Sequence, residues 1–555
     1  MKKILRLTQN ELIKQLKKLS TLIIIGLILL GCLALPMMVK IMSSGGYTFT
    51  EQIEDSIQSS QQQIEYYQNA ESTNQEENKI ELGYEKARLA FYQQAKDWGV
   101  ADFDDWRSDS VYNAEQLSMQ AAKYQMMLDG LSVDLLHQRY SFGEDPEQLK
   151  TMSKEELTKL LNQTKQTLNT TIQAIKKKDY SQYLHTRIRE NNEAIQTQLA
   201  TIKEMKALWD QNPSDESAKL AYENAQGQLN ALQIDKKVMD YRDKNGIERD
   251  KGWKSQTLQM ISNKGSVANP GLMSKKEFDA NGYTYEKEMY KTYDKYLAAK
   301  DEEIRTAKDD MQKYWYSLEH NIPTPEADNG IRNFLTMMLP VTLVVMVLAI
   351  IMAGGIVSGE YSKGTIRLLM LRPAARWKIL LSKYASVLLI SLATLLGGVI
   401  CMVLGGTVAI GAGDLFTPIL SCQNGVVTQQ AFILWYLPKL LFSSINILYG
   451  ASLAFAMSTL FKNTALSVGL SIFATFGGPF AMGLAPHFPW LQYTPFPYYN
   501  LAQFTTQNSY TQDIAAVFGP GTIYGGLYGG LLLAGLSIVV MAISFAVFQK
   551  RDVKN

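Results

Sequence analysis

Cysteine and histidine are scarce in this sequence. Its 555 residues include three cysteines and four histidines. No cysteine lies between Cys32 and Cys401, so that interval contains no disulfide of its own. The four histidines are isolated and lack the spacing of metal ligands. These absences exclude a disulfide-stapled scaffold, and the sequence predicts no bound metal.

Signatures of enzymes are also missing. The sequence has neither the phosphate-binding pattern G-x-x-x-x-G-K-[ST] nor the nucleophile pattern G-x-S-x-G. The stretch 362–365 resembles the end of the first pattern but lacks its upstream glycine. The chain is therefore predicted not to be an enzyme, to bind no cofactor directly and to depend on a partner for energy.

Charge is absent from several long windows, among them 20–39, 333–359 and 384–413. A bilayer core of about 30 Å is crossed by about 20 apolar helical residues. One such run could be a buried helix of a soluble protein, but six could not. The predicted transmembrane helices cover residues 20–42, 332–357, 384–410, 437–460, 464–484 and 522–548, and Pro340 is expected to bend the second.

The net charge of +2 is a cancellation. Residues 41–331 contain 36 Lys and Arg against 48 Asp and Glu, a net of −12, whereas the remainder has 19 against 5, a net of +14. An acidic insert is thus carried by a basic membrane protein. The expected partners include membrane lipids. No nucleic-acid partner is expected.

The basic residues predict the topology, because they accumulate on the cytoplasmic side of membrane proteins. They cluster before the first span, between the second and third, and after the sixth. We therefore expect a multi-pass plasma-membrane protein with both termini cytoplasmic. Lys40, Arg332 and Lys439 lie at outer span ends and are expected to snorkel. The predicted parts are a cytoplasmic segment 1–19, the first span 20–42, an extracellular domain 43–330, spans two to six in 331–549, and a tail 550–555.

The N-terminal stretch has two interpretations. Residues 29–32 resemble a lipoprotein cleavage site that ends in Cys32, which would give a lipid anchor. However, the apolar run continues to Val39, where a cleaved signal would give way to polar residues. An uncleaved signal-anchor helix is favoured.

The acidic insert has helical periodicity. Leu297, Ile304, Met311 and Leu318 recur every seven residues, a pattern of coiled-coil packing. Ser153 with Glu156 and Ser274 with Glu277 fit capping boxes, and helix breaks are expected at 212–213, 244–246 and 269–271. The fold class is an all-α membrane protein with six transmembrane helices and a large extracellular, coiled-coil-like helical domain inserted after the first. Its apolar seams are expected to form a core, or in part a groove for an amphipathic ligand or partner helix.

The segment 359–383 leaves the second span and leads into the third. A turn is expected at Gly364, followed by a short apolar-basic helix that Pro373 ends. Such a helix lies at the membrane interface and can dock on a soluble partner.

This segment resembles the coupling segment of type-2 (ABC-2) permeases of bacterial ATP-binding cassette transporters. The shared pattern, E-x-x-x-G-T-x-x-x-L-x-x-x-P-x-x-R-x-x-x-x-x-x-K, places its residues, with the neighbouring Arg372, at Glu360, Gly364, Thr365, Leu369, Arg372, Pro373, Arg376 and Lys383. The resemblance covers the first span and the chain after Ile331. It implies that this segment contacts a separate ATPase subunit, which binds ATP and Mg²⁺, and that a second permease copy or paralogue completes a dimer. The large insert resembles only a subset of that family.

Two further groups of residues suit a permease. Glycines at the start of the sixth span form G-x-x-x-G pairs suited to close helix packing: Gly525, Gly526, Gly529 and Gly530. Aromatic residues before that span are expected in the outer interfacial belt: Trp490, Tyr493, Tyr498 and Tyr499.

These features predict a transport protein, the permease subunit of an exporter that moves an amphipathic or hydrophobic substrate such as a peptide antibiotic or a lipid. The alternative is a non-transporting envelope or secretion scaffold, or a sensor, whose extracellular helical stalk binds partners.

Overall fold

The computed structural model is predominantly helical and divides into two units. The described residues are 2–44, 47–69, 75–250, 252–280, 285–290, 292–366, 375–477, 489–505 and 526–550. One unit, here the terminal unit, comprises Met1–Ser44 and Leu272–Asn555, and the other, the insert unit, is Gly45–Gly271. The predicted domain 43–330 is therefore divided, because residues 272–330 belong with the terminal unit.

The insert unit is a set of helices joined by short turns. The predicted capping box of Ser153 and Glu156 is present at the start of one of them and is confirmed. Its elements are α3 (Phe49–Asn69), α4 (Gln75–Ala95), η1 (Lys96–Trp98), α5 (Trp106–Leu128), α6 (Val133–Arg139), α7 (Pro146–Thr151), α8 (Lys154–Lys177), α9 (Tyr180–Gln211), α10 (Glu216–Asn245) and α11 (Trp253–Val267).

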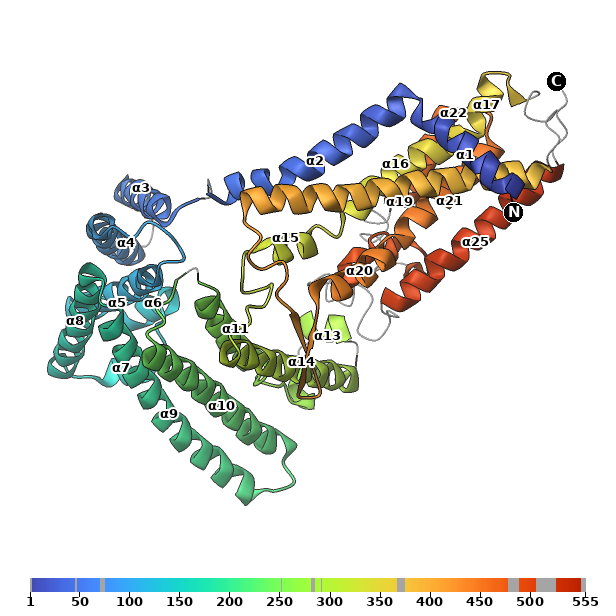
Figure 1. Cartoon of the computed structure of the whole chain (residues 1–555). Coiled ribbons are helices and arrows are strands. Elements are labelled where there is room, and N and C mark those ends of the chain that lie inside the picture. The colour runs from blue at the N-terminus through green and yellow to red at the C-terminus, as the bar shows by residue number, and fades with distance from the viewer. Residues whose placement is uncertain are drawn as a thin grey trace. The chain divides into compact units, whose positions relative to one another are not determined.

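Helices α9 and α10 form an antiparallel hairpin (Figure 1). Asn191 donates a hydrogen bond to the Leu232 carbonyl at 3.0 Å, and Gln198 donates to the Ala225 carbonyl at 2.9 Å. The partner number falls as the α9 number rises, so the two helices run antiparallel on either side of the predicted break at 212–213. Gly246, in a left-handed conformation at φ 61°, ends α10.

The terminal unit contains the long apolar helices. Its elements are α1 (Lys2–Leu16), α2 (Leu19–Ser44), α12 (Lys275–Ala280), α13 (Tyr285–Tyr290), α14 (Tyr293–Glu319), α15 (Ile331–Met337), α16 (Val341–Ile356), α17 (Ser358–Ser362), α19 (Arg376–Ala409), β1 (Ile419–Gln423), β2 (Val426–Gln430), α20 (Phe432–Ser443), α21 (Ile445–Leu460), α22 (Thr464–Phe476), η3 (Pro489–Tyr493), η4 (Phe496–Tyr498), η5 (Leu501–Phe504) and α25 (Gly526–Lys550).

Four stretches of the described chain are long and apolar enough to cross a membrane. They are Leu19–Met42, Arg376–Ala409, Phe432–Leu460 and Gly526–Lys550. The pair α15 and α16 passes the same test together with a bend of 44°, and Pro340 immediately precedes α16. The predicted bend at Pro340 is therefore confirmed.

The fifth predicted span, 464–484, is described only in part. Its helix α22 has 13 residues, and residues 478–488 lie outside the described chain. The described residues thus contain four candidate spans, or five with the bent pair. Six spans stay a prediction.

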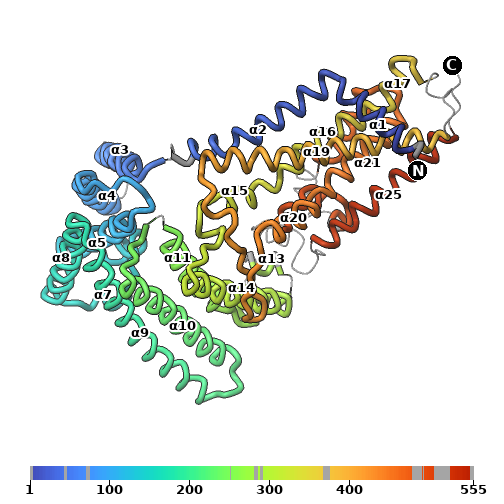
Figure 2. Tube along the Cα trace, viewed as in Figure 1, coloured from blue at the N-terminus to red at the C-terminus, as the bar shows by residue number. Residues whose placement is uncertain are grey.

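Close packing between α2 and α19 depends on small residues. The two helices run side by side (Figure 2). A Cβ atom built on Gly405 would lie 2.2 Å from the Leu33 carbonyl oxygen, and one on Gly398 would lie 3.2 Å from the Cys32 sulfur. Any larger residue at position 405 would push the two backbones apart.

A β-hairpin departs from the predicted all-α architecture. Strands β1 and β2 pair antiparallel, and the turn residues Asn424 and Gly425 both have positive φ, at 50° and 78°. This is the conformation that Asn-Gly favours in two-residue hairpins. Asp309 of α14 accepts hydrogen bonds from the backbone N–H groups of Asn424 and Gly425, at 3.0 and 2.8 Å. The hairpin thereby fastens α14 to the apolar helices.

Arg332 does not snorkel, contrary to prediction. Its side chain is fully buried and pairs with Asp414, with 3.2 Å between Nε and Oδ2. The guanidinium also donates to the carbonyls of Pro323, Thr417 and Pro418 at 2.8 to 3.3 Å. Asp414 in turn accepts from two backbone N–H groups at the start of α15. A buried arginine with all its partners supplied inside the protein has no need to reach the interface.

Lys40 and Lys439 also bind protein oxygens. Lys40 donates to the Ala409 carbonyl and Lys439 to the Thr505 carbonyl, each at 2.5 Å. The Lys439 ammonium lies 3.5 Å from the centre of the Trp435 ring. Both ammonium groups are thus bound within the protein.

Replacing Asp414 by alanine tests the buried ion pair. Asp414→Ala leaves the Arg332 cation buried without its counter-charge, at an expected cost of about 3–5 kcal/mol. The midpoint of thermal unfolding in detergent should fall well below that of the native protein. Asp301→Ala, at an exposed position of α14, serves as the control and should leave the midpoint nearly unchanged. Equal midpoints for the two variants would contradict this role of Asp414.

Candidate coupling site around Glu360

The site is built where α16 ends and a short helix, α17, begins. Ser458 of α21 accepts hydrogen bonds from the backbone N–H groups of Val357 and Ser358, at 3.1 and 2.9 Å. The Ser358 hydroxyl donates to the Gly354 carbonyl at 2.6 Å. A side chain of another helix thus satisfies donors that a change of helix direction would leave unpaired. This fixes the position of α17 and of Glu360 within it.

Glu360 lies at the centre of a buried cluster of alternating charges. Lys383 of α19 is 3.4 Å from a Glu360 oxygen and 3.1 Å from an oxygen of Glu11 in α1. Lys14 of α1 and the Thr365 hydroxyl also donate to Glu360. Lys383 is 1%, Glu11 5% and Glu360 9% exposed. Two lysines and two glutamates therefore balance each other; Lys383 and both glutamates are buried, whereas Lys14 lies at the exposed edge. We call these four residues the Glu360 cluster.

The surroundings set the charge state of Glu360. Burial raises the pKa of its carboxyl, but the hydrogen bonds from Lys14 and Thr365 and the charge of Lys383 outweigh burial and lower the pKa to about 2. Glu360 is therefore ionised at neutral pH and holds both lysines.

Helix α1 presents an unusual face to this cluster. Its buried residues are polar: Thr8, Glu11 and Gln15. Its exposed residues include Leu5 and Ile13, at 68% and 46%. A helix with an outward apolar face suits the boundary between lipid and water.

A cavity of about 320 Å³ opens beside the cluster. Lys14, Lys18 and Lys363 line it together with Glu360 and Lys383. Burial, followed by the charges of Lys14, Lys383 and Lys363, lowers the pKa of Lys18. The charged residues of this lining are four lysines and one glutamate.

The structure places the predicted coupling residues in two groups. Glu360, Thr365 and Lys383 are brought together, and Gly364 turns the chain between the first two at φ 69°. Arg376, at the start of α19, instead donates to the Gln549 carbonyl of α25 at 3.1 Å. Leu369, Arg372 and Pro373 lie outside the described residues.

Sequence reasoning missed Glu11 and Lys14 as members of the site. Both lie in the basic N-terminal segment, where Lys14 counts as one of several cytoplasmic lysines. The polar residues Thr8, Glu11 and Gln15 recur at helical spacing, and this was the available signal. A polar stripe of this kind does not reveal its partners, which lie 346 residues away for Lys14 and Glu360 and 372 residues away for Glu11 and Lys383.

The glycines of α25 face aromatic side chains of the same unit. A Cβ on Gly529 would lie 2.1 Å from the Tyr498 ring, and one on Gly530 would lie 2.6 Å from the Phe442 ring. Gly526 similarly faces Phe504, whereas Gly525 lies outside the described residues. Because these glycines have no side chain, they leave space for the aromatic rings of Tyr498, Phe442 and Phe504.

Tyr498 is not an interfacial residue, contrary to prediction. It is fully buried and packs with Leu501 and Leu533, because the glycine surface of α25 leaves space for its ring. Trp490 and Tyr493 are exposed, at 60% and 53%, and Tyr499 is half-buried.

These features define a predominantly helical protein with several helices able to span a membrane and a buried charge cluster beside them. The family described as "Protein of unknown function (DUF2705)" matches residues 305–554. The uncharacterized protein YhcI of Bacillus subtilis (strain 168) is 32% identical over 245 residues, which cover 43% of this chain and 74% of that protein. The chain belongs to this family. Residues 45–271 lie outside the stretch that the family description matches.

Acidification should loosen the Glu360 cluster. A carboxyl whose pKa is lowered on folding, here from 4.5 to about 2, stabilises the fold above its unfolded pKa. That stabilisation is lost as the pH falls from the higher to the lower value. We expect the difference in thermal midpoint between the native protein and Glu360→Gln to shrink over this range.

The control for this experiment is Glu319→Gln, at an exposed position of α14. Its midpoint should follow that of the native protein at every pH. A difference between the native protein and Glu360→Gln that stays constant from neutral pH down to pH about 3 would contradict the assigned role of Glu360.

Proposed function

We propose that this protein is the permease subunit of an ATP-binding cassette exporter. A separate ATPase subunit would bind ATP and Mg²⁺, and this chain would convert the ATPase motion into movement of an amphipathic or hydrophobic substrate, such as a peptide antibiotic or a lipid. The proposal includes six spans, cytoplasmic termini, an extracellular insert and a second copy or paralogue in a dimer. Its first support is the resemblance of the segment 359–383 to ABC-2 coupling segments.

The observation that carries the proposal is the Glu360 cluster. It joins the beginning of the coupling segment to α19 through Lys383 and to α1 through Lys14. The pair of Lys383 and Glu360 is buried and therefore costly to separate, whereas Lys14 reaches Glu360 from the exposed side. A push on the segment is therefore transmitted to α1 and α19 together.

The connection continues into other helices of the terminal unit. α17 is held to α21 through Ser458, and α19 is bound to the end of α25 through Arg376 and Gln549. α2 packs tightly on α19 at Gly405. Docking of the ATPase on the segment 359–383 can therefore move several apolar helices at once through these contacts.

The expected side of the membrane agrees with the composition of this region. The segment and α1 are basic, as cytoplasmic regions are, and the outward apolar face of α1 suits the inner membrane surface. The long helices expose large apolar side chains, such as Leu527 and Ile538 of α25, which suit lipid or a second copy. Few charges line these helices, which favours an apolar or amphipathic substrate.

The variant Glu360→Gln distinguishes binding of the ATPase subunit from coupling of its activity to the permease. In a complex with an ATPase subunit that co-purifies with the native protein, reconstituted in nanodiscs, the variant should still co-purify, because Glu360 is buried and not part of a docking surface. Its vanadate-sensitive, substrate-stimulated ATPase activity should fall by about tenfold, because the connection to α19 is weakened. Lys308→Gln, at an exposed position of α14, is the control and should retain full stimulation.

Gly364 provides the second arm of the same experiment. Its left-handed conformation is accessible to asparagine but strained by roughly 1–2 kcal/mol or more for a β-branched residue. Gly364→Val should therefore lose co-purification of the ATPase, whereas Gly364→Asn should retain it. Failure of the native protein to bind any such ATPase would refute the proposed function.

A further inference from the structure

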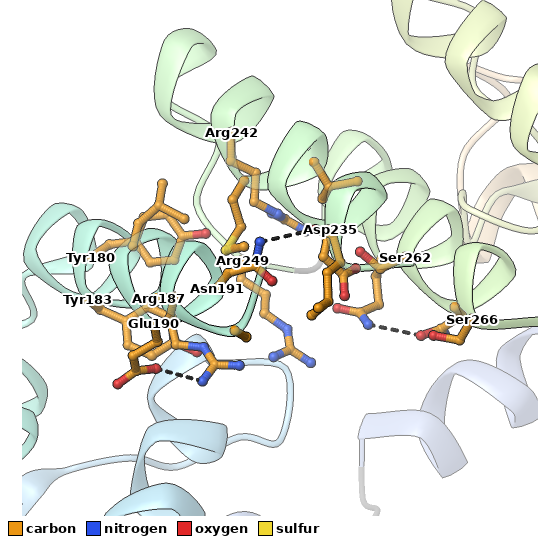
Figure 3. Close-up of a pocket in the computed structure, with 17 residues that line it drawn as sticks. Tyr180, Tyr183, Arg187, Glu190, Asn191, Asp235, Arg242, Arg249, Ser262 and Ser266 are labelled. Atoms are coloured by element: carbon orange, nitrogen blue, oxygen red, sulfur yellow. Dashed lines mark hydrogen bonds and ion pairs between the residues drawn. The ribbon is translucent and has the colours of Figure 1, made fainter. Parts of the chain in front are cut away.

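The cavity of about 320 Å³ beside the Glu360 cluster contains cations that no carboxylate of the described residues matches. The larger cavity of the insert unit, about 530 Å³ between α9, α10 and α11, serves as a comparison (Figure 3). There, Arg187 pairs with Glu190 and Arg249 pairs with Asp109. These two arginines are held by carboxylates of the protein, whereas two of the lysines beside Glu360 are not.

A count of the charges at the cavity beside Glu360 gives the excess. Lys383 is paired with both Glu11 and Glu360, and Lys14 is paired with Glu360. Glu11 is not part of the lining but belongs in the count, because it touches Lys383. Two carboxylates then face four cations, which leaves an excess of two positive charges. The four cations are Lys14, Lys18, Lys363 and Lys383.

Lys18 and Lys363 are the two cations that remain without a counter-charge. Lys18 donates to the neutral amide oxygen of Gln15 at 2.7 Å. Neither lysine forms an ion pair with a described residue. Outside the acidic insert 41–331, the described chain contains one further carboxylate besides Glu11 and Glu360. It is that of Asp414, which pairs with Arg332.

The lysines repel one another across the cavity. Lys18 is half-buried, and burial, followed by the charges of Lys14, Lys383 and Lys363, lowers the pKa of its ammonium group. Glu11 opposes this effect more weakly. An anion bound between Lys18 and Lys363 would therefore relieve a repulsion that the protein leaves uncompensated.

The position of the cavity along the helices points to a lipid. Gly355 and Ile356 line it at the end of α16, and Lys18 directly precedes α2. Both α2 and the bent pair of α15 and α16 are long and apolar enough to cross a membrane. The ends of such helices lie at the level of the lipid headgroups. Leu19 and Leu22, which follow Lys18, are 72% and 48% exposed and suit contact with acyl chains.

We propose that this cavity binds the phosphate group of an anionic phospholipid such as phosphatidylglycerol. Lys18 and Lys363 would donate charge-assisted hydrogen bonds to the phosphate oxygens, while Glu360 keeps its own lysine partners. A zwitterionic lipid suits the cavity less well, because its ammonium group would meet the same excess of positive charge. A soluble phosphate has no acyl chains for the exposed leucines of α2. This inference does not depend on the proposed transport function.

A matched pair of lipids tests the site in the full chain, purified in a mild detergent without any ATPase. The probes are phosphatidylglycerol and phosphatidylcholine with the same acyl chains, and native mass spectrometry measures the bound fraction as each is titrated. We expect saturable binding of phosphatidylglycerol and binding weaker by about tenfold for phosphatidylcholine. An excess of inorganic phosphate should not displace the bound phosphatidylglycerol, because it lacks the apolar contacts.

Two neighbouring lysines locate the binding. Lys18→Gln removes a cavity cation and should weaken binding of phosphatidylglycerol by about tenfold. Lys17→Gln removes the same charge one residue away, outside the cavity lining, and should leave the affinity nearly unchanged. It thereby controls for attraction by the overall charge. Lys363→Gln, at an exposed position after α17, should repeat the loss of affinity and keep the native thermal midpoint.

The proposal is wrong if the native chain shows no saturable binding, if the two lipids bind equally, or if Lys18→Gln and Lys17→Gln have equal effects. Displacement of the lipid by inorganic phosphate would also overturn it and would assign the cavity to a soluble phosphate. Because no ATPase is present, each of these results leaves the proposed transport function standing. Conversely, failure to find an ATPase partner would not affect this site.

Discussion

Charge balance inside the protein is the constraint on which the terminal unit depends. Lys383 is almost fully buried and is held between two glutamates that are far apart in the sequence, Glu11 and Glu360. Removing either glutamate would take away one of the two ion pairs of a cation that water cannot solvate. α1, α17 and α19 therefore have one favourable arrangement, and the segment after α17 starts from a fixed point. The proposed coupling to an ATPase depends on this fixed start of the segment. A mobile attachment would not transmit the motion of the ATPase to the helices.

The two units solve different stability problems. The terminal unit buries apolar helices and pairs its few charges internally, as at Arg332 and Asp414. The insert unit has no cysteine and must rely on packing, helix caps and hydrogen bonds between helices, such as those from Asn191 and Gln198. The family description matches residues of the first unit only.

Local patterns in the sequence predicted the helices well, and contacts between distant residues escaped prediction. Absence of charge marked the apolar helices, Pro340 marked the bend, and Ser153 with Glu156 marked a helix start, since each signal acts within a few residues. The hairpin turn at Asn424 and Gly425 carried an equally local signal, which the search for apolar runs overlooked. The burial of Arg332, Tyr498 and Lys383 depends on partners far away in sequence, at Asp414, Gly529 and Glu11. One sequence alone does not identify such partners.

The pairing of Arg332 with Asp414 also constrains how the chain is made. The two residues are 82 positions apart, and three apolar stretches, α15, α16 and α19, are synthesised before both are available. Until Asp414 has been synthesised, Arg332 is a cation without its counter-charge in an apolar helix. A charged side chain of this kind is costly to place in a lipid environment. Asp414 follows α19, so this buried ion pair forms only after α16 and α19 have been made.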